Sequence, residues 1–204
     1  MITEHLFPTL LYVKDLPNAN ALNNYLEQKI MQWSQQDKGL SKTNAGGWHS
    51  GTDMNKKEEY NVLTRELFTM QEEIFTKERL DQKPVLGNMW ANVNYPKCYN
   101  RPHIHPNSLF SGVYFVKTPK GSGNLMVYDP RPGIHMIMPN RKGDKRTKNM
   151  ILDHGPLPSE LWREVHYEPI AGRLIMFPAW LWHEVIPNAS NDTRISVSFN
   201  FLQR

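Results

Sequence analysis

The sequence contains two histidines separated by a single residue, His103 and His105, within the segment Asn100-Arg-Pro-His-Ile-His-Pro-Asn107. In an extended segment, residues two positions apart point to the same side of the chain, so both imidazoles can reach one ion. A third histidine, His183, and an arginine, Arg194, follow much later in the chain. A purely structural role explains this set poorly, and we interpret it as a metal site accompanied by a functional arginine.

The kind of metal follows from the ligand types that the chain offers. Imidazole favours iron, copper, nickel or zinc, and a site poor in carboxylates selects against magnesium and calcium. The single cysteine, Cys98, excludes cysteine-rich zinc and iron–sulfur sites and any internal disulfide, which suits a reducing cytoplasm. The remaining histidines have no partner at ligand spacing, and we expect structural roles for them: His5, His49, His135, His154 and His166.

Length and composition indicate one globular domain. The 204 residues can bury one sizeable core, and 39% hydrophobic with 22% charged residues is typical of a soluble protein. No apolar run approaches the length of a membrane span, and the first residues lack the features of a signal peptide, so a cytoplasmic location is expected, in the host if the source is viral. The net charge of +4 is mild, and we interpret the basic stretch 141–148 as a solvated loop.

The elements that must position these residues begin with a helical region. Residues 6–13 predict an opening strand at a sheet edge. Apolar residues at three- and four-residue spacing predict one helix after Pro17 and a second over roughly 59–80. We expect both helices to pack against one face of a sheet.

The stretch between the two helices, residues 37–53, is polar and rich in glycine, and it predicts a loop. Trp48 and His49 lie in this stretch and could line a pocket. We favour a simpler interpretation, in which they pack on the surface of the domain.

After residue 87 the periodicity becomes that of strands. Apolar residues alternate with Trp90, Asn92 and Asn94, and because asparagine is a poor strand former, this polar face indicates the wall of a wet cavity. About seven or eight short strands in the second half predict a β-sandwich or jelly roll. We expect residues 109–116 and 124–128 to form a hairpin, and the strand that starts at Arg194 to neighbour the strand of His183.

Residues 129–163 interrupt this pattern. They are rich in proline, glycine and basic residues, and the stretch is longer than connections within a compact domain usually are. Such insertions are commonly functional lids or surface segments. A short helical turn is expected over residues 157–162.

Several segments, taken together and in this order, resemble the jelly-roll dioxygenases that depend on Fe(II) and 2-oxoglutarate, and in particular their prolyl-hydroxylase-like branch with its small phage and bacterial members. The resemblance rests on the following stretches: Asn94-Tyr95-Pro96, His103-Ile-His105, Ser111-Gly-Val-Tyr-Phe-Val116, Gly123-Asn-Leu-Met-Val-Tyr128, Gly172-Arg-Leu-Ile-Met-Phe-Pro178, His183-Glu-Val185 and Arg194-Ile-Ser196. It implies a mainly β chain with N-terminal helices (α+β), folded as a double-stranded β-helix or cupin-like jelly roll. Residues 88–204 would then be the catalytic core and residues 1–87 a helical support with an edge strand.

Position by position, the resemblance makes His103 and His183 iron ligands and places His105 where the family normally has a carboxylate. A neutral imidazole there removes one negative charge from around the iron, which should raise its potential and weaken discrimination against other divalent metals. His103, His105 and His183 are therefore the expected catalytic metal ligands.

The resemblance also implies a site for 2-oxoglutarate. Arg194 corresponds to the residue that pairs with its distal carboxylate, because the planar guanidinium donates two parallel hydrogen bonds to a carboxylate. Ser196 faces the same way along the strand and, with Tyr95, is an expected hydroxyl donor. Candidate substrate contacts are Trp90, Asn92, Tyr99 and Asn107.

The implied activity is hydroxylation with Fe(II), 2-oxoglutarate and O₂, on a peptide or protein substrate with a peptidyl proline as the leading guess. The basic stretch leaves room for a nucleic-acid substrate, and no membrane partner is expected. Two alternatives remain open: a three-histidine dioxygenase that uses no 2-oxoglutarate, and a catalytically silent metal-binding jelly roll with a structural or virion role. Arg194 argues against the first alternative, since that enzyme needs no carboxylate clamp.

Overall fold

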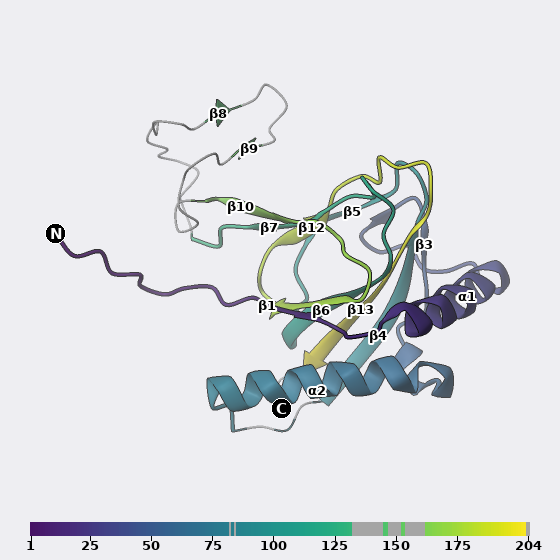
Figure 1. Ribbon diagram of the computed structural model, residues 1–204, viewed down its shortest axis with the longest axis horizontal. Coiled ribbons are helices and arrows are strands. Elements are labelled where there is room, and N and C mark those ends of the chain that lie inside the picture. Colours follow the sequence, from purple (N-terminus) through teal and green to yellow (C-terminus); the bar gives the residue numbers. More distant parts are fainter. Residues whose placement is uncertain (82, 84, 132–144, 147–151, 154–161, 203–204) are drawn as a thin grey trace.

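The computed structural model describes residues 1–81, 83, 85–131, 145–146, 152–153 and 162–202. The centre of the fold is a pair of antiparallel sheets that face one another (Figure 1). The six-stranded sheet has the order β1-β11-β6-β13-β4-β3, and the five-stranded sheet has the order β10-β7-β12-β5-β2. Strands from distant parts of the sequence alternate in both sheets, which gives the chain a jelly-roll fold.

The six-stranded sheet contains the longest strands. Its members are β1 (Tyr12–Asp15), β3 (Trp48–His49), β4 (Val85–Asn94), β6 (Ser108–Lys117), β11 (Arg173–Pro178) and β13 (Arg194–Leu202). The five-stranded sheet consists of β2 (Asn44–Ala45), β5 (Tyr99–His103), β7 (Leu125–Tyr128), β10 (Glu164–Tyr167) and β12 (His183–Val185). A separate pair, β8 (Lys145–Arg146) and β9 (Leu152–Asp153), lies in the insertion.

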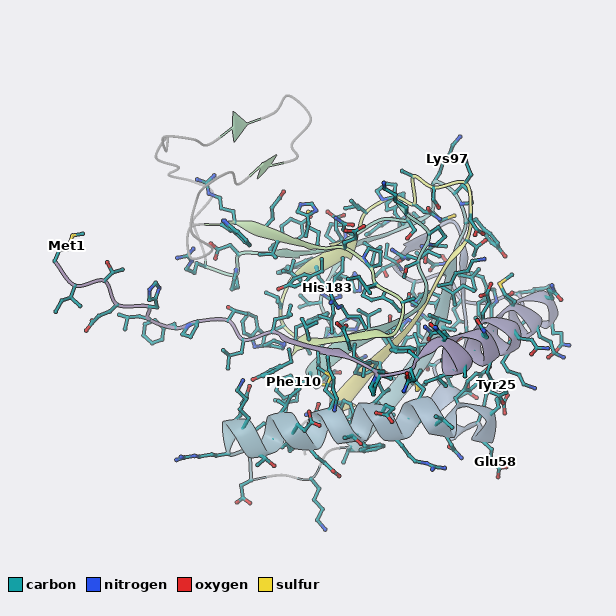
Figure 2. All side chains as sticks on the ribbon, viewed as in Figure 1. Met1, Tyr25, Glu58, Lys97, Phe110 and His183 are labelled. Atoms are coloured by element: carbon teal, nitrogen blue, oxygen red, sulfur yellow. The ribbon has the colours of Figure 1, made fainter. Side chains whose placement is uncertain are left out.

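Two helices lie along the face of the six-stranded sheet that points away from the five-stranded sheet (Figure 1). They are α1 (Asn20–Gln36) and α2 (Asn61–Glu78), and two 3₁₀ turns, Met54–Lys56 and Glu58–Tyr60, precede α2. Their buried apolar side chains share one core cluster with residues of β4 and β13, including Met89, Val93 and Phe199. Phe110, labelled in Figure 2, contacts Phe75 of α2 at a ring-centroid distance of 6.3 Å. No helix among the described residues is long and apolar enough to cross a membrane.

Alternation along β4 and β13 gives the six-stranded sheet two different faces. Met89, Ala91 and Val93 point into the helix-covered core, whereas Trp90 and Asn92 line a cavity between the two sheets. The polar face predicted for residues 88–94 is therefore confirmed as a cavity wall. A smaller apolar cluster between the sheets, which includes Val113, Phe115, Leu125 and Phe177, closes the rest of the interface.

The structure corrects four expectations about the elements. The opening strand is β1, which starts only at Tyr12, although it is an edge strand as predicted. Pro8 has no backbone N–H, and Phe7 has a positive φ of 57°, so residues 6–11 do not extend the ladder. The predicted loop 37–53 contains the short strands β2 and β3.

The other two corrections concern strand neighbours. The strands β6 and β7 do not form the predicted hairpin, because β6 lies in the six-stranded sheet and β7 in the five-stranded sheet. Likewise β13 is not a neighbour of β12: β13 pairs with β4 and β6, and β12 pairs with β5 and β7. In both cases the chain crosses from one sheet to the other, as a jelly roll requires. The helical turn predicted over 157–162 and most of the basic stretch 141–148 lie outside the described residues.

Candidate metal centre

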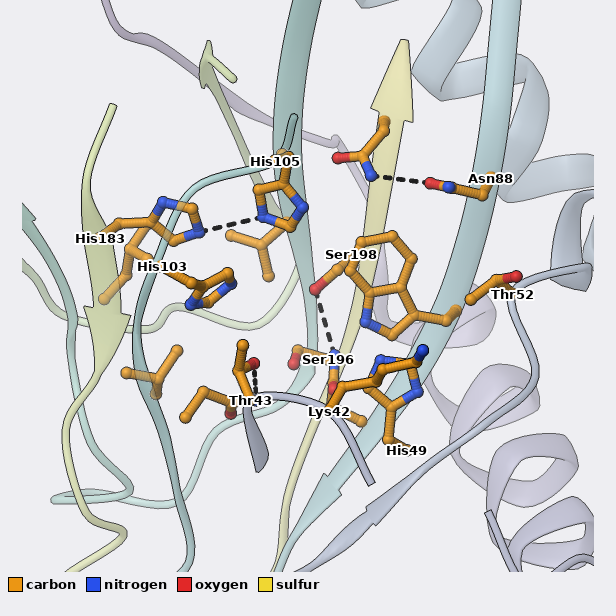
Figure 3. Close-up of a pocket in the computed structure, with 18 of the residues that line it drawn as sticks. Lys42, Thr43, His49, Thr52, Asn88, His103, His105, His183, Ser196 and Ser198 are labelled. Atoms are coloured by element: carbon orange, nitrogen blue, oxygen red, sulfur yellow. Dashed lines mark hydrogen bonds between the residues drawn. The ribbon is translucent and has the colours of Figure 1, made fainter. Parts of the chain in front are cut away.

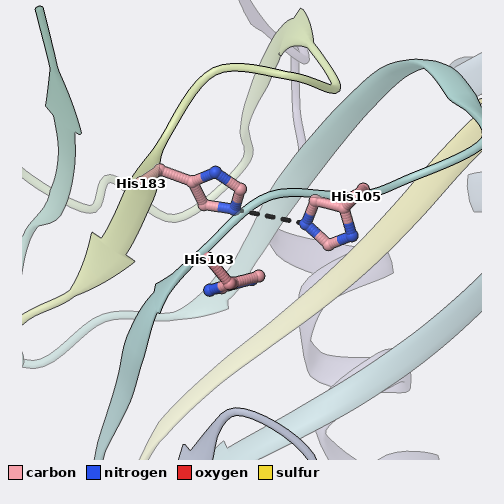
Figure 4. Close-up of side chains that lie close together, drawn as sticks. All are labelled: His103, His105 and His183. Carbon is pink, nitrogen blue, oxygen red and sulfur yellow. Dashed lines mark hydrogen bonds between the residues drawn. The ribbon is translucent and has the colours of Figure 1, made fainter. Parts of the chain in front are cut away.

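The three histidines predicted to bind a metal come together at one end of the cavity (Figure 4). His103 is the last residue of β5 and His183 the first of β12, and the two are directly paired across the five-stranded sheet. His105 lies in the loop after β5, where its backbone N–H donates to the carbonyl oxygen of Ala179 at 2.9 Å. One ring nitrogen from each histidine lies within 4.8 Å of the others. Figure 2 shows His183 deep in the interior of the molecule.

Hydrogen bonds orient two of these rings. Nδ1 of His103 lies 2.6 Å from the carbonyl oxygen of Arg101, and Nδ1 of His183 lies 2.8 Å from that of Leu181. Because a carbonyl only accepts, each Nδ1 carries the proton and donates it, which leaves the Nε2 lone pair free. Such a bond on the far nitrogen is the usual support of a metal-binding histidine.

The spacing of the ring nitrogens fits a shared ion. Nε2 of His105 and Nε2 of His183 are 3.2 Å apart. Two nitrogens bound at right angles to one ion, each about 2.1 Å from it, stand about 3 Å apart. The donor set therefore fits a transition metal with imidazole ligands.

Burial keeps all three imidazoles neutral. It lowers the pKa of His103, and it lowers the pKa of His183 well below its usual range, with the neighbouring histidines as a second cause. The pKa of His105 falls to about 3, mainly through burial and further through the charge that His103 would carry. Neutral imidazole is the form that binds metals, so the cluster needs no deprotonation at neutral pH.

Arg194 also lines the cavity, at the start of β13 and four residues from Ser198, whose partner Trp90 contacts His105. It is almost completely buried, with 1% of its surface exposed. Its Nη1 donates to the carbonyl oxygen of Gly123 and its Nη2 to Oδ1 of Asn94, both at 3.1 Å. Its Nε is buried without a partner, and no carboxylate of the described chain forms an ion pair with the guanidinium. Burial lowers the pKa of Arg194 to about 10, so the group keeps its charge at neutral pH. A buried, unpaired cation of this kind fits an anionic ligand.

The cavity that the histidines and Arg194 line has a volume of about 320 Å³ (Figure 3). One wall comes from the paired strands β4 and β13, where Asn92 faces Ser196 and Trp90 faces Ser198. The opposite wall carries the histidines, and apolar side chains such as Phe177 and Val113 complete the lining. Among the described residues that line the cavity, none is an aspartate or a glutamate.

The structure brings some predicted site residues together and separates others. Ser196, Trp90 and Asn92 line the cavity with the histidines and Arg194. Tyr95 follows the end of β4 and is 42% exposed, and Tyr99 is 36% exposed; neither lines the cavity. Asn107 is exposed, has a φ of 63°, and also lies outside the lining.

Several lining residues were missed from the sequence. Asn88, Ser198 and Asn200 share the cavity face of β4 and β13, and strand alternation extended from Asn92 and Ser196 could have found them. His49 was expected to be structural, yet it lines the cavity and stacks on Trp90. It comes from the two-residue strand β3, which leaves no recognisable pattern in the sequence. Lys42, Thr43 and Thr52 reach the cavity from the same N-terminal region.

Comparison with known proteins agrees with this geometry. A family model described as "Putative 2OG-Fe(II) oxygenase" matches residues 88–200, while no curated protein matches the sequence. Among solved structures, a prolyl-4-hydroxylase from Pseudomonas putida superposes with a TM-score of 0.65 at 16% identity, over 96% of this chain and 94% of that one. The viral collagen prolyl hydroxylase from Paramecium bursaria Chlorella virus-1 gives 0.59 at 14% identity, over 94% of both chains. A Trichoplax adhaerens prolyl hydroxylase, solved with a peptide fragment of hypoxia inducible factor, gives 0.61 at 12% identity, over 94% of this chain and 83% of that one. At these identities the likeness concerns the jelly-roll fold.

Proposed function

The chain belongs to the 2OG-Fe(II) oxygenase family, and from this premise we propose that its three clustered histidines bind the iron and that Arg194 binds 2-oxoglutarate. Members of this family are oxygenases that use Fe(II), 2-oxoglutarate and O₂. The proposal concerns the residues that perform each role and the substrate that is oxidised.

The observation that carries the proposal is the buried guanidinium of Arg194. A buried charge without a counter-ion is strongly unfavourable, so a position like this is retained for a ligand that supplies the missing anion. The distal carboxylate of 2-oxoglutarate is such an anion, and the unpartnered Nε of Arg194 is a donor available to it. Ser196, two residues along the same face of β13, adds a hydroxyl beside it.

The proposed iron site is held by His103, His105 and His183. Three neutral imidazoles suit Fe(II), although they also suit zinc, nickel and copper. The neutral ligand His105 leaves the metal one negative charge short of the usual set of two histidines and one carboxylate. When bound, the iron supplies the oxidation of a substrate C–H bond by O₂, coupled to the conversion of 2-oxoglutarate to succinate and CO₂.

The remaining roles belong to the protein. Arg194 is separated from the histidines by four residues along β13, since Ser198 is paired with Trp90 beside His105, so a dicarboxylate held between the guanidinium and the histidines would have a fixed orientation. The apolar wall that contains Phe177, Val113 and Phe115 excludes water from the space beside the histidines. No acid or base side chain is required for these roles.

For the substrate, we propose a peptide or protein side chain, with proline first. Support comes from the jelly-roll neighbours, of which one is a prolyl-4-hydroxylase and another was solved with a peptide fragment. We also propose that residues 1–204 form one domain, with residues 1–87 as support for the catalytic core 88–204. This division is not strict, because β3 of the support region brings His49 into the cavity.

The test is to measure succinate after Fe(II)-loaded protein is mixed with 2-oxoglutarate in air, with and without proline-containing peptides. We expect slow succinate formation without a peptide, and faster formation together with a peptide that gains one oxygen atom. His183→Ala is expected to abolish both, and Arg194→Ala is expected to need about a hundredfold more 2-oxoglutarate for the same rate. Iron-bound protein that never forms succinate would favour a silent metal-binding jelly roll, and oxygen consumption without 2-oxoglutarate would favour the other dioxygenase class.

A further inference from the structure

The three proposed iron ligands are not supported in the same way. His103 and His183 each donate Nδ1–H to a backbone carbonyl, at 2.6 and 2.8 Å. The only ring hydrogen-bond contact of His105 to the described residues is the one between its Nε2 and Nε2 of His183, on the side that faces the other ligands. Among the described residues, its far nitrogen thus has no carbonyl or carboxylate partner of the kind that normally fixes a metal-binding imidazole.

Contacts with other rings take the place of that bond. The ring of His105 contacts two others: it stacks on that of His183, at 5.1 Å and 15° between planes, and meets that of Trp90 in a tilted arrangement, at 5.8 Å and 38°. Trp90 in turn stacks on His49, at 5.5 Å and 12°. Four rings thus form a continuous column, His49–Trp90–His105–His183, that runs from β3 to β12.

The outer end of the column is fixed to the sheet. Nδ1 of His49 donates to the carbonyl oxygen of Ser50 at 2.7 Å. Ser50 in turn is joined to Ala91, next to Trp90: its hydroxyl oxygen accepts from the Ala91 N–H at 2.9 Å, and its own N–H donates to the Ala91 carbonyl at 3.0 Å. His49 is 5% and Trp90 8% exposed, so both rings are buried.

On the basis of the proposed iron site, we propose that Trp90, held in place by His49, is the positioning residue of His105, and that His105 is the most easily exchanged of the three ligands. Stacking restrains the plane of a ring but supplies no directional bond to either nitrogen. His105 can therefore leave the metal at a smaller loss of affinity than His103 or His183. If His105 were released, only two histidines would hold the iron, and one more coordination position would be open.

The test compares the affinity for Co(II), a stand-in for Fe(II), in an anaerobic equilibrium competition with a chelator. The full-length variants are His103→Ala, His183→Ala, His105→Ala, Trp90→Ala, Trp90→Phe and the double variant Trp90→Ala/His105→Ala. Trp180→Ala serves as the matched control, because Trp180 is 54% exposed and lies outside the cavity. X-ray absorption at the cobalt edge counts the bound imidazoles in each protein.

We expect His105→Ala and Trp90→Ala each to weaken Co(II) binding about tenfold, the lower end of the range for lost ligand support. The double variant should be no weaker than either single one, because both changes remove the same contact. Trp90→Phe, which keeps a stacking ring, should bind like the native protein, and Trp90→Ala should show fewer than three imidazoles. His103→Ala and His183→Ala should lose more than a hundredfold.

Additive losses in the double variant, or three imidazoles retained in Trp90→Ala, would overturn the inference. So would equal losses for all three histidine variants. A different result would contradict the proposed iron site itself: His103→Ala and His183→Ala that bind Co(II) as tightly as the native protein. Trp90→Phe that binds Co(II) as weakly as Trp90→Ala would also count against the inference, because the phenylalanine ring keeps the contact with His105.

Discussion

The two ends of the cavity respond to burial in opposite ways. At the histidine end, burial lowers the pKa of every imidazole and leaves neutral groups with free lone pairs. At the other end, the pKa of Arg194 falls only to about 10, so the same burial leaves a charge that nothing in the described chain neutralises. The histidine end is thus suited to a metal cation, and the Arg194 end to an anion. Because the two ends differ, a dicarboxylate between them can lie in only one direction.

The two ends also depend on different parts of the fold. His103 and His183 belong to the five-stranded sheet, and Arg194 belongs to the six-stranded sheet, in register with Asn94 of β4. Because the ends are built separately, a change at one of them should leave the other intact. The following predictions test that independence.

The largest effect is expected from His183→Ala. His183 is 4% exposed and oriented by Leu181, so its loss removes a firmly held ligand. We expect metal affinity to fall more than about a hundredfold, beyond the range for lost ligand support alone. Equilibrium dialysis against Fe(II) measures this under anaerobic conditions, with His166→Ala as control, since His166 contacts Glu164 outside the cluster. Unchanged metal content in His183→Ala would contradict a metal site at this end.

Arg194→Ala should weaken 2-oxoglutarate binding about a hundredfold and leave metal content unchanged. The loss corresponds to one or two charged hydrogen bonds, at about 1.5–3 kcal/mol each. The affinity of Arg194→Lys for 2-oxoglutarate should lie between those of the native protein and Arg194→Ala, because lysine keeps the charge but not the planar pair of donors. Calorimetric titration of 2-oxoglutarate into Zn(II)-loaded protein measures the effect. Arg173→Ala is the matched control, since Arg173 pairs with Asp15. If Arg173→Ala lost as much affinity for 2-oxoglutarate as Arg194→Ala, the effect could not be assigned to Arg194.

The pH dependence of stability near neutral pH should come from the buried histidines, which are the three of the cluster and His49, and Arg194 should not contribute to it. The pKa of His105 is about 3 in the folded protein, below its value of about 6.5 in an unfolded chain. The stabilisation is present above pH 6.5 and is lost as the pH falls, because the unfolded chain binds the proton first. Between pH 6.5 and 5 the loss amounts to about 2 kcal/mol for His105.

Urea unfolding of the metal-free protein at pH 7 and pH 5 checks this loss. His105→Ala should lose about 2 kcal/mol less than the native protein over that range. Arg194→Met should leave the pH dependence unchanged, since the guanidinium does not titrate there. An identical loss in native protein and His105→Ala would show that His105 is not buried in its neutral form.

The smallest effect is expected from His105→Asp, which introduces a carboxylate beside His103 and His183. Metal affinity should stay within about tenfold of the native value, because a lost nitrogen ligand is replaced by a negatively charged oxygen ligand. Affinity for 2-oxoglutarate should be reduced only slightly, by the added negative charge. Dialysis and calorimetry measure both quantities. A loss as large as that in His183→Ala would mean that position 105 requires an imidazole.

The sequence predicted the parts of this site that alternation and spacing reveal. The asparagines of β4 indicated a polar cavity wall, and the His-x-His pair with His183 indicated a cluster that the structure does form. The placement of Arg194 next to the His183 strand was wrong, because the short connection between them suggested a hairpin although the chain changes sheets there.

His49 shows where reasoning from the sequence ends. Its position opposite Asn92 depends on pairing between β3 and β4, which lie far apart in the sequence. A strand of two residues is too short to show the alternation of apolar and polar residues from which a strand is predicted. Tyr95 lies one residue beyond the end of β4 and is not among the residues that line the cavity, and its role as a hydroxyl donor stays a prediction.

The most direct test of the two-ended cavity is an anaerobic titration of Fe(II)-loaded protein with 2-oxoglutarate, followed through the weak visible absorption band of an iron-bound 2-oxo acid. We expect the band to appear and to saturate in the native protein. Arg194→Ala should need about a hundredfold more 2-oxoglutarate to reach the same band, and His183→Ala should give none. Native protein that holds iron but gives no band at any concentration of 2-oxoglutarate would contradict the account.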